Sequence, residues 1–207
     1  MILLFKSALY KIKKSFGRFL SVVLIVALGT GFFSGLREAS PDMLETIDKY
    51  YDDSLLMDYK ITSTMGLTDD DITSLEKLKY VDKVIPSYSV DVLSDGKAIR
   101  LHAISDKVNK VILEDGKMPS NHSECLADAS EYKVGDTINF EKDNLSDFVN
   151  ISSCKVSGTI TSALYLSTEK GIANVGNGKL EAFVYIPEED FTLDYYTEAY
   201  ILAKGSL

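Results

Sequence analysis

Side chains that commonly perform catalysis are few in this chain, and none of them forms a recognisable catalytic motif. The two histidines, His102 and His122, stand outside any HExxH zinc-protease motif. No G-x-S-x-G motif, which holds the serine nucleophile of α/β-hydrolases, occurs in the sequence. His102 lies in a predicted strand, where we expect a half-exposed structural side chain and not a metal ligand. The sequence thus predicts no catalytic residue, no metal site and no enzymatic activity.

A glycine-rich stretch, GIANVGNGK at residues 171–179, comes closest to a phosphate-binding loop. Such a loop requires Ser or Thr after its Gly-Lys pair, whereas Leu180 follows here, and Ala173 occupies the place of the first glycine. The tripeptide at residues 176–178, Gly-Asn-Gly, is instead typical of a tight turn before a strand. The sequence therefore predicts no nucleotide or other cofactor.

The two cysteines, Cys125 and Cys154, lack the CxxC spacing of zinc and redox motifs. In an extracytoplasmic domain they could form a disulfide, and the alternative is two separate buried thiols, since small buried cysteines are also common. The sequence leaves both possibilities open.

Three consecutive aspartates, residues 69–71, follow Thr68. We expect Thr68 to cap a helix, because carboxylates in a first helical turn are stabilised by the helix dipole. Cation binding is the alternative, but consecutive side chains diverge around a helix and do not converge on one ion.

Charge is distributed unevenly along the chain, whose formal net charge is -9. Residues 1–38 contain six Lys or Arg and one acid, a net charge of +5, and the remainder has a net charge of -14. A basic arm before an acidic body is expected when only the arm touches an anionic membrane. The acidic body argues against nucleic acid as a partner, because phosphate contacts require clustered Lys and Arg.

One segment is long and apolar enough to span a bilayer. Residues 19–36 contain no charge, and as a helix they would measure about 27 Å, close to the thickness of the hydrocarbon core. Cationic residues precede the segment and almost none follow it directly. The positive-inside rule then places the N-terminus in the cytoplasm and residues from about 40 onward outside the cell membrane.

A basic amphipathic helix is predicted just before this span, in residues 1–18. Its apolar and cationic side chains would meet the cytoplasmic membrane interface. They are Phe5, Lys6, Leu9, Ile12, Lys13, Lys14, Phe16 and Arg18. A cleaved secretory signal peptide is the alternative, but its apolar region is usually shorter and its basic region less patterned. Gly31 and Gly35 form a GxxxG motif that would permit close packing of another membrane helix.

The rest of the chain predicts an α+β fold. After a helical stalk at residues 39–55, the order is strand, helix, strand (81–93) and strand (98–104), which is the opening of a ferredoxin-like unit. A β-rich insertion would occupy residues 111–190, with a turn at 113–119 and strands at 155–160 and 181–186. The strand at residues 198–203 would rejoin the first unit. We therefore expect a transmembrane helix at 19–38 and a porter-like subdomain at 56–110 and 191–207, incomplete at its C-terminal end.

Several segments, taken in order, resemble one family of membrane proteins. Residues 5–43 look like the start of FtsX-like ABC transporter permeases. Residues 67–93 resemble the first porter segment of the MacB-like periplasmic core domain. Residues 113–129, 132–140 and 155–191 resemble the β-rich subdomain inserted in that domain. Each piece is weakly specific, and the ordered series is more so.

The resemblance implies a permease subunit that couples a cytoplasmic ATP-binding subunit to movement of an extracytoplasmic domain. It implies a homodimer and further permease membrane helices, since family members have at least three more spans than this chain contains. We therefore expect either the N-terminal fragment of a permease or a split-gene product. One alternative is a single-span binding or sensor protein. Another is a secreted enzyme, which would require cleavage of the anchor and an active site.

Overall fold

The computed structural model describes residue 6, residues 10–141 and residues 148–205. It divides the chain into two compact units, residues 1–49 and residues 50–207.

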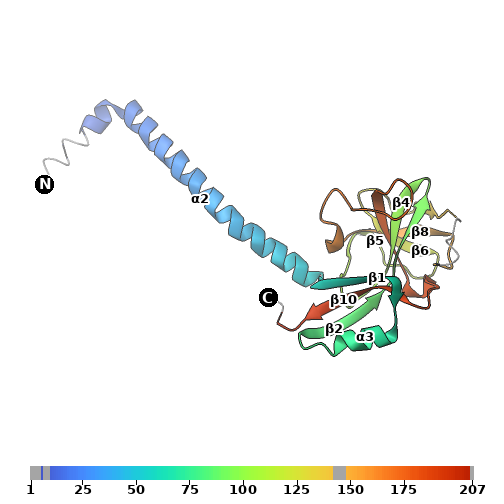
Figure 1. Ribbon diagram of the computed structural model, residues 1–207. Coiled ribbons are helices and arrows are strands. Elements are labelled where there is room, and N and C mark those ends of the chain that lie inside the picture. Colours follow the sequence, from blue (N-terminus) through green and yellow to red (C-terminus); the bar gives the residue numbers. More distant parts are fainter. Residues whose placement is uncertain (1–5, 7–9, 142–147, 206–207) are drawn as a thin grey trace. The chain divides into compact units, whose positions relative to one another are not determined.

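The first unit is helical throughout its described part. Residues 10–14 form a short helical segment, Ser15 is a turn, and helix α2 (Phe16–Asp53) follows (Figure 1). No residue of α2 is fully buried, and the most apolar 18-residue window has a mean hydropathy of 2.2, so α2 is long and apolar enough to span a membrane. The stalk expected at residues 39–55 is helical as far as Asp53, as the continuous end of α2. The hydroxyls of Ser21 and Thr30 donate to carbonyls of their own helix, which satisfies them without an outside partner.

The second unit begins with a small antiparallel sheet. Its strands are β1 (Tyr59–Leu67), β10 (Tyr196–Ala203) and β2 (Val81–Ser87), in that order, with helix α3 (Asp69–Glu76) packed against β2 (Figure 1). Ile72 of α3 lies in a core with side chains from all three strands. The predicted cap is confirmed, because the Thr68 hydroxyl accepts from the backbone N–H of Asp71 and the Asp71 carboxylate accepts from the backbone N–H of Thr68.

The larger sheet has seven strands, in the order β3-β4-β9-β6-β8-β5, with β7 paired to β8. Their bounds are β3 Ser89–Ser94, β4 Lys97–Ala103, β5 Ile112–Gly116, β6 Glu124–Asp128, β7 Thr137–Asn139, β8 Ser153–Thr161 and β9 Leu180–Ile186. Short 3-10 helices occupy Ala163–Tyr165 and Glu188–Asp190. One face of the sheet forms the principal core, which includes Ile99, Leu101, Val184 and Ile186. The α+β fold class predicted from the sequence is confirmed by these elements.

Strand assignment differs from the sequence-based prediction at three places. The single strand expected at 81–93 is two strands in different sheets, because the chain leaves β2 at Tyr88, whose ring stacks on Phe191 at 5.1 Å. The sequence places residues 98–104 in the ferredoxin-like subdomain with 81–93, but β4 pairs with β9 of the predicted insertion. The predicted turn at 113–119 is partly a strand, β5, since it pairs with β8. The predicted domain bounds themselves stay a prediction.

Cys125 and Cys154 form a disulfide between the neighbouring strands β6 and β8. Both residues lie in the principal core, with exposures of 0% and 2%. The structure therefore selects the first of the two possibilities that the sequence left open.

Replacing both cysteines, Cys125→Ala and Cys154→Ala, should lower the free energy of unfolding by about 3–4 kcal/mol, because the bridge links residues 29 positions apart in the unfolded chain. Urea unfolding of the full chain in detergent, followed by tyrosine circular dichroism, measures this change. As a control, a reducing agent should destabilise the wild type by a similar amount and leave the double variant unaffected. Equal unfolding midpoints for the oxidised wild type and the double variant would contradict a stabilising bridge.

Candidate functional site

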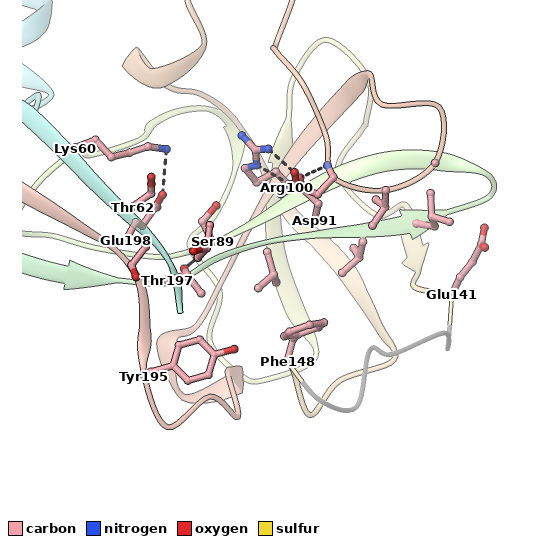
Figure 2. A pocket seen from close by; sticks show the side chains of 18 residues that line it. Lys60, Thr62, Ser89, Asp91, Arg100, Glu141, Phe148, Tyr195, Thr197 and Glu198 are labelled. Carbon is pink, nitrogen blue, oxygen red and sulfur yellow. Dashed lines mark hydrogen bonds and ion pairs between the residues drawn. The ribbon is translucent and has the colours of Figure 1, made fainter. Parts of the chain in front are cut away.

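A cavity of about 870 Å³ opens in the second unit, between the small sheet and the first strand of the large one (Figure 2). Its walls come from β1, β3, β10, the loop at residues 174–176 and the side chain of Arg100 on β4. Phe148 and Tyr195 contribute aromatic rings, and hydroxyls come from both β1 and β3. The volume falls within the range of sites that hold small molecules or short peptide segments.

An ion pair fixes one wall of this cavity. Arg100 donates two hydrogen bonds to the carboxylate of Asp91, at 2.6 and 2.9 Å, and a third to the carbonyl of Ile172 at 2.8 Å. The same carboxylate accepts from the backbone N–H of Asn174 at 2.8 Å. The hydrogen bonds from Asp91 raise the pKa of the Arg100 guanidinium further above its usual value. This bidentate pair thus holds the loop at residues 172–174 against the hairpin of β3 and β4.

A second polar cluster contains the buried carboxylate of Glu198, which is 2% exposed in the central strand β10. Lys60 of the neighbouring strand β1 lies 3.1 Å from it, and the Tyr200 hydroxyl donates to it. His102 of β4, in the other sheet, places its Nδ1 atom 3.5 Å from the same carboxylate. The cluster therefore connects the two sheets through side chains.

The hydrogen bonds around His102 indicate which tautomer is present. Its Nε2 atom lies 2.6 Å from the hydroxyl of Tyr165, which has a proton to donate, whereas the carboxylate of Glu198 can only accept. We assign the hydrogen to Nδ1, so that a neutral ring accepts from Tyr165 and directs its N–H toward Glu198.

Burial sets the protonation states of this pair. Complete burial lowers the pKa of His102 and outweighs the opposing effect of Glu198, so the ring is neutral at pH 7. Burial alone would raise the pKa of Glu198, but His102, Lys60 and the Tyr200 hydroxyl together outweigh it and lower that pKa to about 2. Glu198 is therefore a charged group in the interior, compensated mainly by the ammonium of Lys60.

The sequence predicted no role for Glu198, and the exposure that it predicted for His102 differs from the structure. The expectation of a half-exposed His102 is wrong, since the residue is 2% exposed between two tyrosine rings. The one signal in the sequence was an acidic residue inside an alternating strand, at residues 198–203. Within the described residues, no group of three His, Cys, Asp or Glu side chains could hold a metal ion.

The predicted membrane-interface residues lie in two separate helical segments. Ile12, Lys13 and Lys14 belong to the short segment at residues 10–14, whereas Phe16 and Arg18 belong to α2 beyond the turn at Ser15. All are exposed except Ile12, which is half-buried, and Lys6 is helical and exposed. Phe5 and Leu9 lie outside the described residues.

The predicted helix-packing residues, Gly31 and Gly35, lie one turn apart on α2. A Cβ atom placed at either glycine would meet open space, so both positions are accessible. Their packing role stays a prediction.

The structure has counterparts among solved domains, although no family model and no curated protein matches the sequence. The extracellular domain of the noncanonic ABC-type transporter YknZ from Gram-positive bacteria shares 14% identity, with a TM-score of 0.42 over 70% of this chain and 76% of that one. The periplasmic region of MacB from Actinobacillus actinomycetemcomitans shares 16% identity, with a TM-score of 0.37 over 71% of this chain and 68% of that one.

Acidification should destabilise the second unit, beginning below about pH 6.5. The unfolded state takes up a proton on His102 near that pH, whereas the folded state, with its lowered pKa, does not. The contribution of His102 to the free energy of unfolding is fully present above pH 6.5. It falls as the pH decreases below that value, by up to about 1.4 kcal/mol per pH unit for one proton. Glu198 adds a second loss between about pH 4.5 and 2.

Urea unfolding of the full chain at pH 7.5, 6.5, 5.5 and 5.0 measures this dependence. The variant His102→Gln should lose the decrease between pH 6.5 and 5.0, whatever its stability at pH 7.5. The matched control His122→Gln leaves the buried pair intact and should retain the decrease. A decrease of equal size in His102→Gln would assign the pH dependence to other groups.

Proposed function

We propose that this chain is the membrane-anchored part of an ABC transporter permease, in which a cytoplasmic ATP-binding subunit drives movement of an extracytoplasmic body. The observation that carries this proposal is that one chain contains both the exposed apolar helix α2 and, after it in sequence, a separately folded acidic body. The helix exposes its entire uncharged segment, and the body has its own apolar cores and disulfide. A long apolar surface of this kind is stable in lipid and not in water.

The asymmetry of charge supports an orientation with the N-terminus in the cytoplasm. Exposed Lys13, Lys14 and Arg18 precede the uncharged segment, and Arg37 at its far end is followed directly by Glu38. Positive charge is retained on the cytoplasmic side of a membrane. A structural disulfide in the body agrees with this orientation, because disulfides persist in oxidising compartments outside the cytoplasm.

The basic segment before α2 suits a place at the cytoplasmic interface. Its cations would meet anionic headgroups, each contributing about 1 kcal/mol near the surface. Ile12 would face the acyl chains together with the neighbouring apolar positions. A segment in this place would lie where a cytoplasmic ATP-binding subunit meets the membrane.

The proposal includes partners within the membrane. Gly31 and Gly35 offer a flat, accessible strip on α2, which suits close approach of a further permease helix or of α2 from a second copy. The ordered resemblance of the sequence segments to permeases supports this assembly over a solitary anchor. We propose a non-enzymatic role for the chain itself. Its buried ionisable groups, His102 and Glu198, contact each other between the two sheets, which is a structural role.

Site-specific photocrosslinking in native membranes tests the proposal. A benzoylphenylalanine residue at Tyr10, which is 70% exposed in the basic segment, should crosslink to an ATP-binding subunit that mass spectrometry identifies by its phosphate-binding loop. The matched control carries the same group at Leu166, which is 60% exposed in the body, and should not.

Genes beside this one supply an independent test. We expect them to encode an ATP-binding subunit and further membrane spans. A stand-alone gene, together with no ATP-binding protein crosslinked at Tyr10, Lys13 or Lys14, would contradict the permease proposal and favour a single-span binding protein.

A further inference from the structure

Strand β3 forms the floor of the cavity along its edge and not along one face. Five consecutive residues, 89–93, line the cavity. Successive side chains of a strand point to opposite faces, so a cavity that reaches all five must follow the strand edge. This edge is the one that β4 does not cover, since β3 is the terminal strand of its sheet among the described residues.

The register of the hairpin shows which backbone groups face the cavity. The turn at Asp95-Gly96 has two residues with positive φ, 50° and 76°, and directly joins the paired residues Ser94 and Lys97. Counting back from that pair, Val92 and Val90 hydrogen bond with β4. The intervening residues, Ser89, Asp91 and Leu93, direct their backbone N–H and C=O groups away from β4.

Two of these six outward groups have partners at the ends of the strand. The N–H of Ser89 donates to the Thr197 hydroxyl at 2.6 Å, and the carbonyl of Leu93 accepts from the backbone N–H of Glu141 at 2.8 Å. Between them remain the carbonyl of Ser89, both groups of Asp91 and the N–H of Leu93. Within the described residues these four groups have no backbone partner, and their spacing is that of an antiparallel strand template.

Opposite charges lie at the two ends of this template (Figure 2). The ammonium of Lys60 lies at the Ser89 end, where β1 and β10 meet β3, with its side chain 34% exposed. Glu141 lies at the Leu93 end, where its carboxylate accepts from the N–H of Gly96 at 2.8 Å. A polypeptide antiparallel to β3 would place its N-terminal end at Glu141 and its C-terminal end at Lys60. A cation at its start would complement Glu141, and a carboxylate at its finish would lie beside Lys60, which also pairs with Glu198.

Two features hold parts of the walls around the template in place. β1 leaves its register between Thr62 and Leu67, which turns residues 63–64 toward the cavity. Gly66 permits this bulge, since a Cβ there would lie 2.2 Å from the Tyr195 ring. The Arg100–Asp91 pair fixes the opposite wall. Such preorganisation favours binding because little entropy is lost.

We propose that this groove binds an extended polypeptide segment from a partner protein, which adds as an antiparallel strand to β3, with a cationic residue at its N-terminal end and a carboxylate at its C-terminal end. This binding role goes beyond the proposed function. Its test contains no ATP-binding subunit, so failure here would leave the permease proposal standing.

Fluorescence anisotropy of the full chain in detergent tests the proposal with a defined probe. The probe is a labelled peptide of sequence Lys-Val-Thr-Val-Thr-Val-Glu with a free C-terminus. We expect saturable binding below about 1 mM. The reversed-charge peptide, Glu-Val-Thr-Val-Thr-Val-Lys with an amidated C-terminus, should bind at least about fivefold more weakly. A peptide with every backbone N methylated should not bind, because it cannot donate to β3.

A matched pair of variants locates the binding on β3. Leu93→Pro removes an outward N–H without touching the ladder to β4, and it should weaken binding about tenfold or more. Leu93→Ala loses the same side chain but retains the N–H, and it should bind within about twofold of the wild type. Tyrosine circular dichroism checks that both variants are folded.

Three results would overturn the proposal. They are no saturable binding of the first peptide, equal binding of the N-methylated peptide, and equal binding by Leu93→Pro and the wild type. If Leu93→Pro does not fold, the N-methylated peptide on the wild type decides the question alone.

Discussion

The buried carboxylate of Glu198 is the constraint on which the second unit, residues 50–207, depends. A charge in the interior costs several kcal/mol unless it is paired and hydrogen bonded. Glu198 is paired with Lys60 on β1 and accepts a hydrogen bond from Tyr200 on β10, and the neutral ring of His102 on β4 directs its Nδ1 atom toward the same carboxylate at 3.5 Å. The last contact crosses from the small sheet to the large one, so docking of the two sheets buries the carboxylate and brings the His102 ring beside it. We expect separation of the two sheets to expose this charge and to remove its contact with His102, while Lys60 stays beside it in the small sheet.

The cavity follows from the same arrangement. Where the sheets meet at Glu198 they are held together, and beyond that point β1 leaves its register while β3 runs on along the large sheet. In the space between them, the middle of the β3 edge has backbone groups without a backbone partner among the described residues. The shape of a cavity at such a junction would change whenever the docking of the two sheets changes. In the permease that we propose, movement transmitted from the membrane to the small sheet would therefore alter this groove first.

Local features of the fold were predictable from the sequence, and contacts between distant segments were not. The continuous helix through residue 41, the Thr68 cap and the hairpin turn at 94–97 each follow from neighbouring residues. The membership of residues 89–103 in the large sheet depends on pairing with a strand some eighty residues later, and an alternating pattern carries no information about its partner. The burial of His102 and the cavity arise from that same pairing. The candidate site was thus invisible in the sequence, except for one acidic residue in an alternating strand.

Membrane topology is the central claim, and thiol labelling in intact cells tests it most directly. The native cysteines form a buried disulfide, so a single introduced cysteine provides the reactive thiol. A membrane-impermeant maleimide should label the Ser167→Cys variant, exposed in the body, in intact cells. It should label Lys13→Cys, exposed in the basic segment, only after the membrane is permeabilised. Labelling of Lys13→Cys in intact cells, or protection of Ser167→Cys until permeabilisation, would contradict an extracytoplasmic body carried by a single span with a cytoplasmic basic arm.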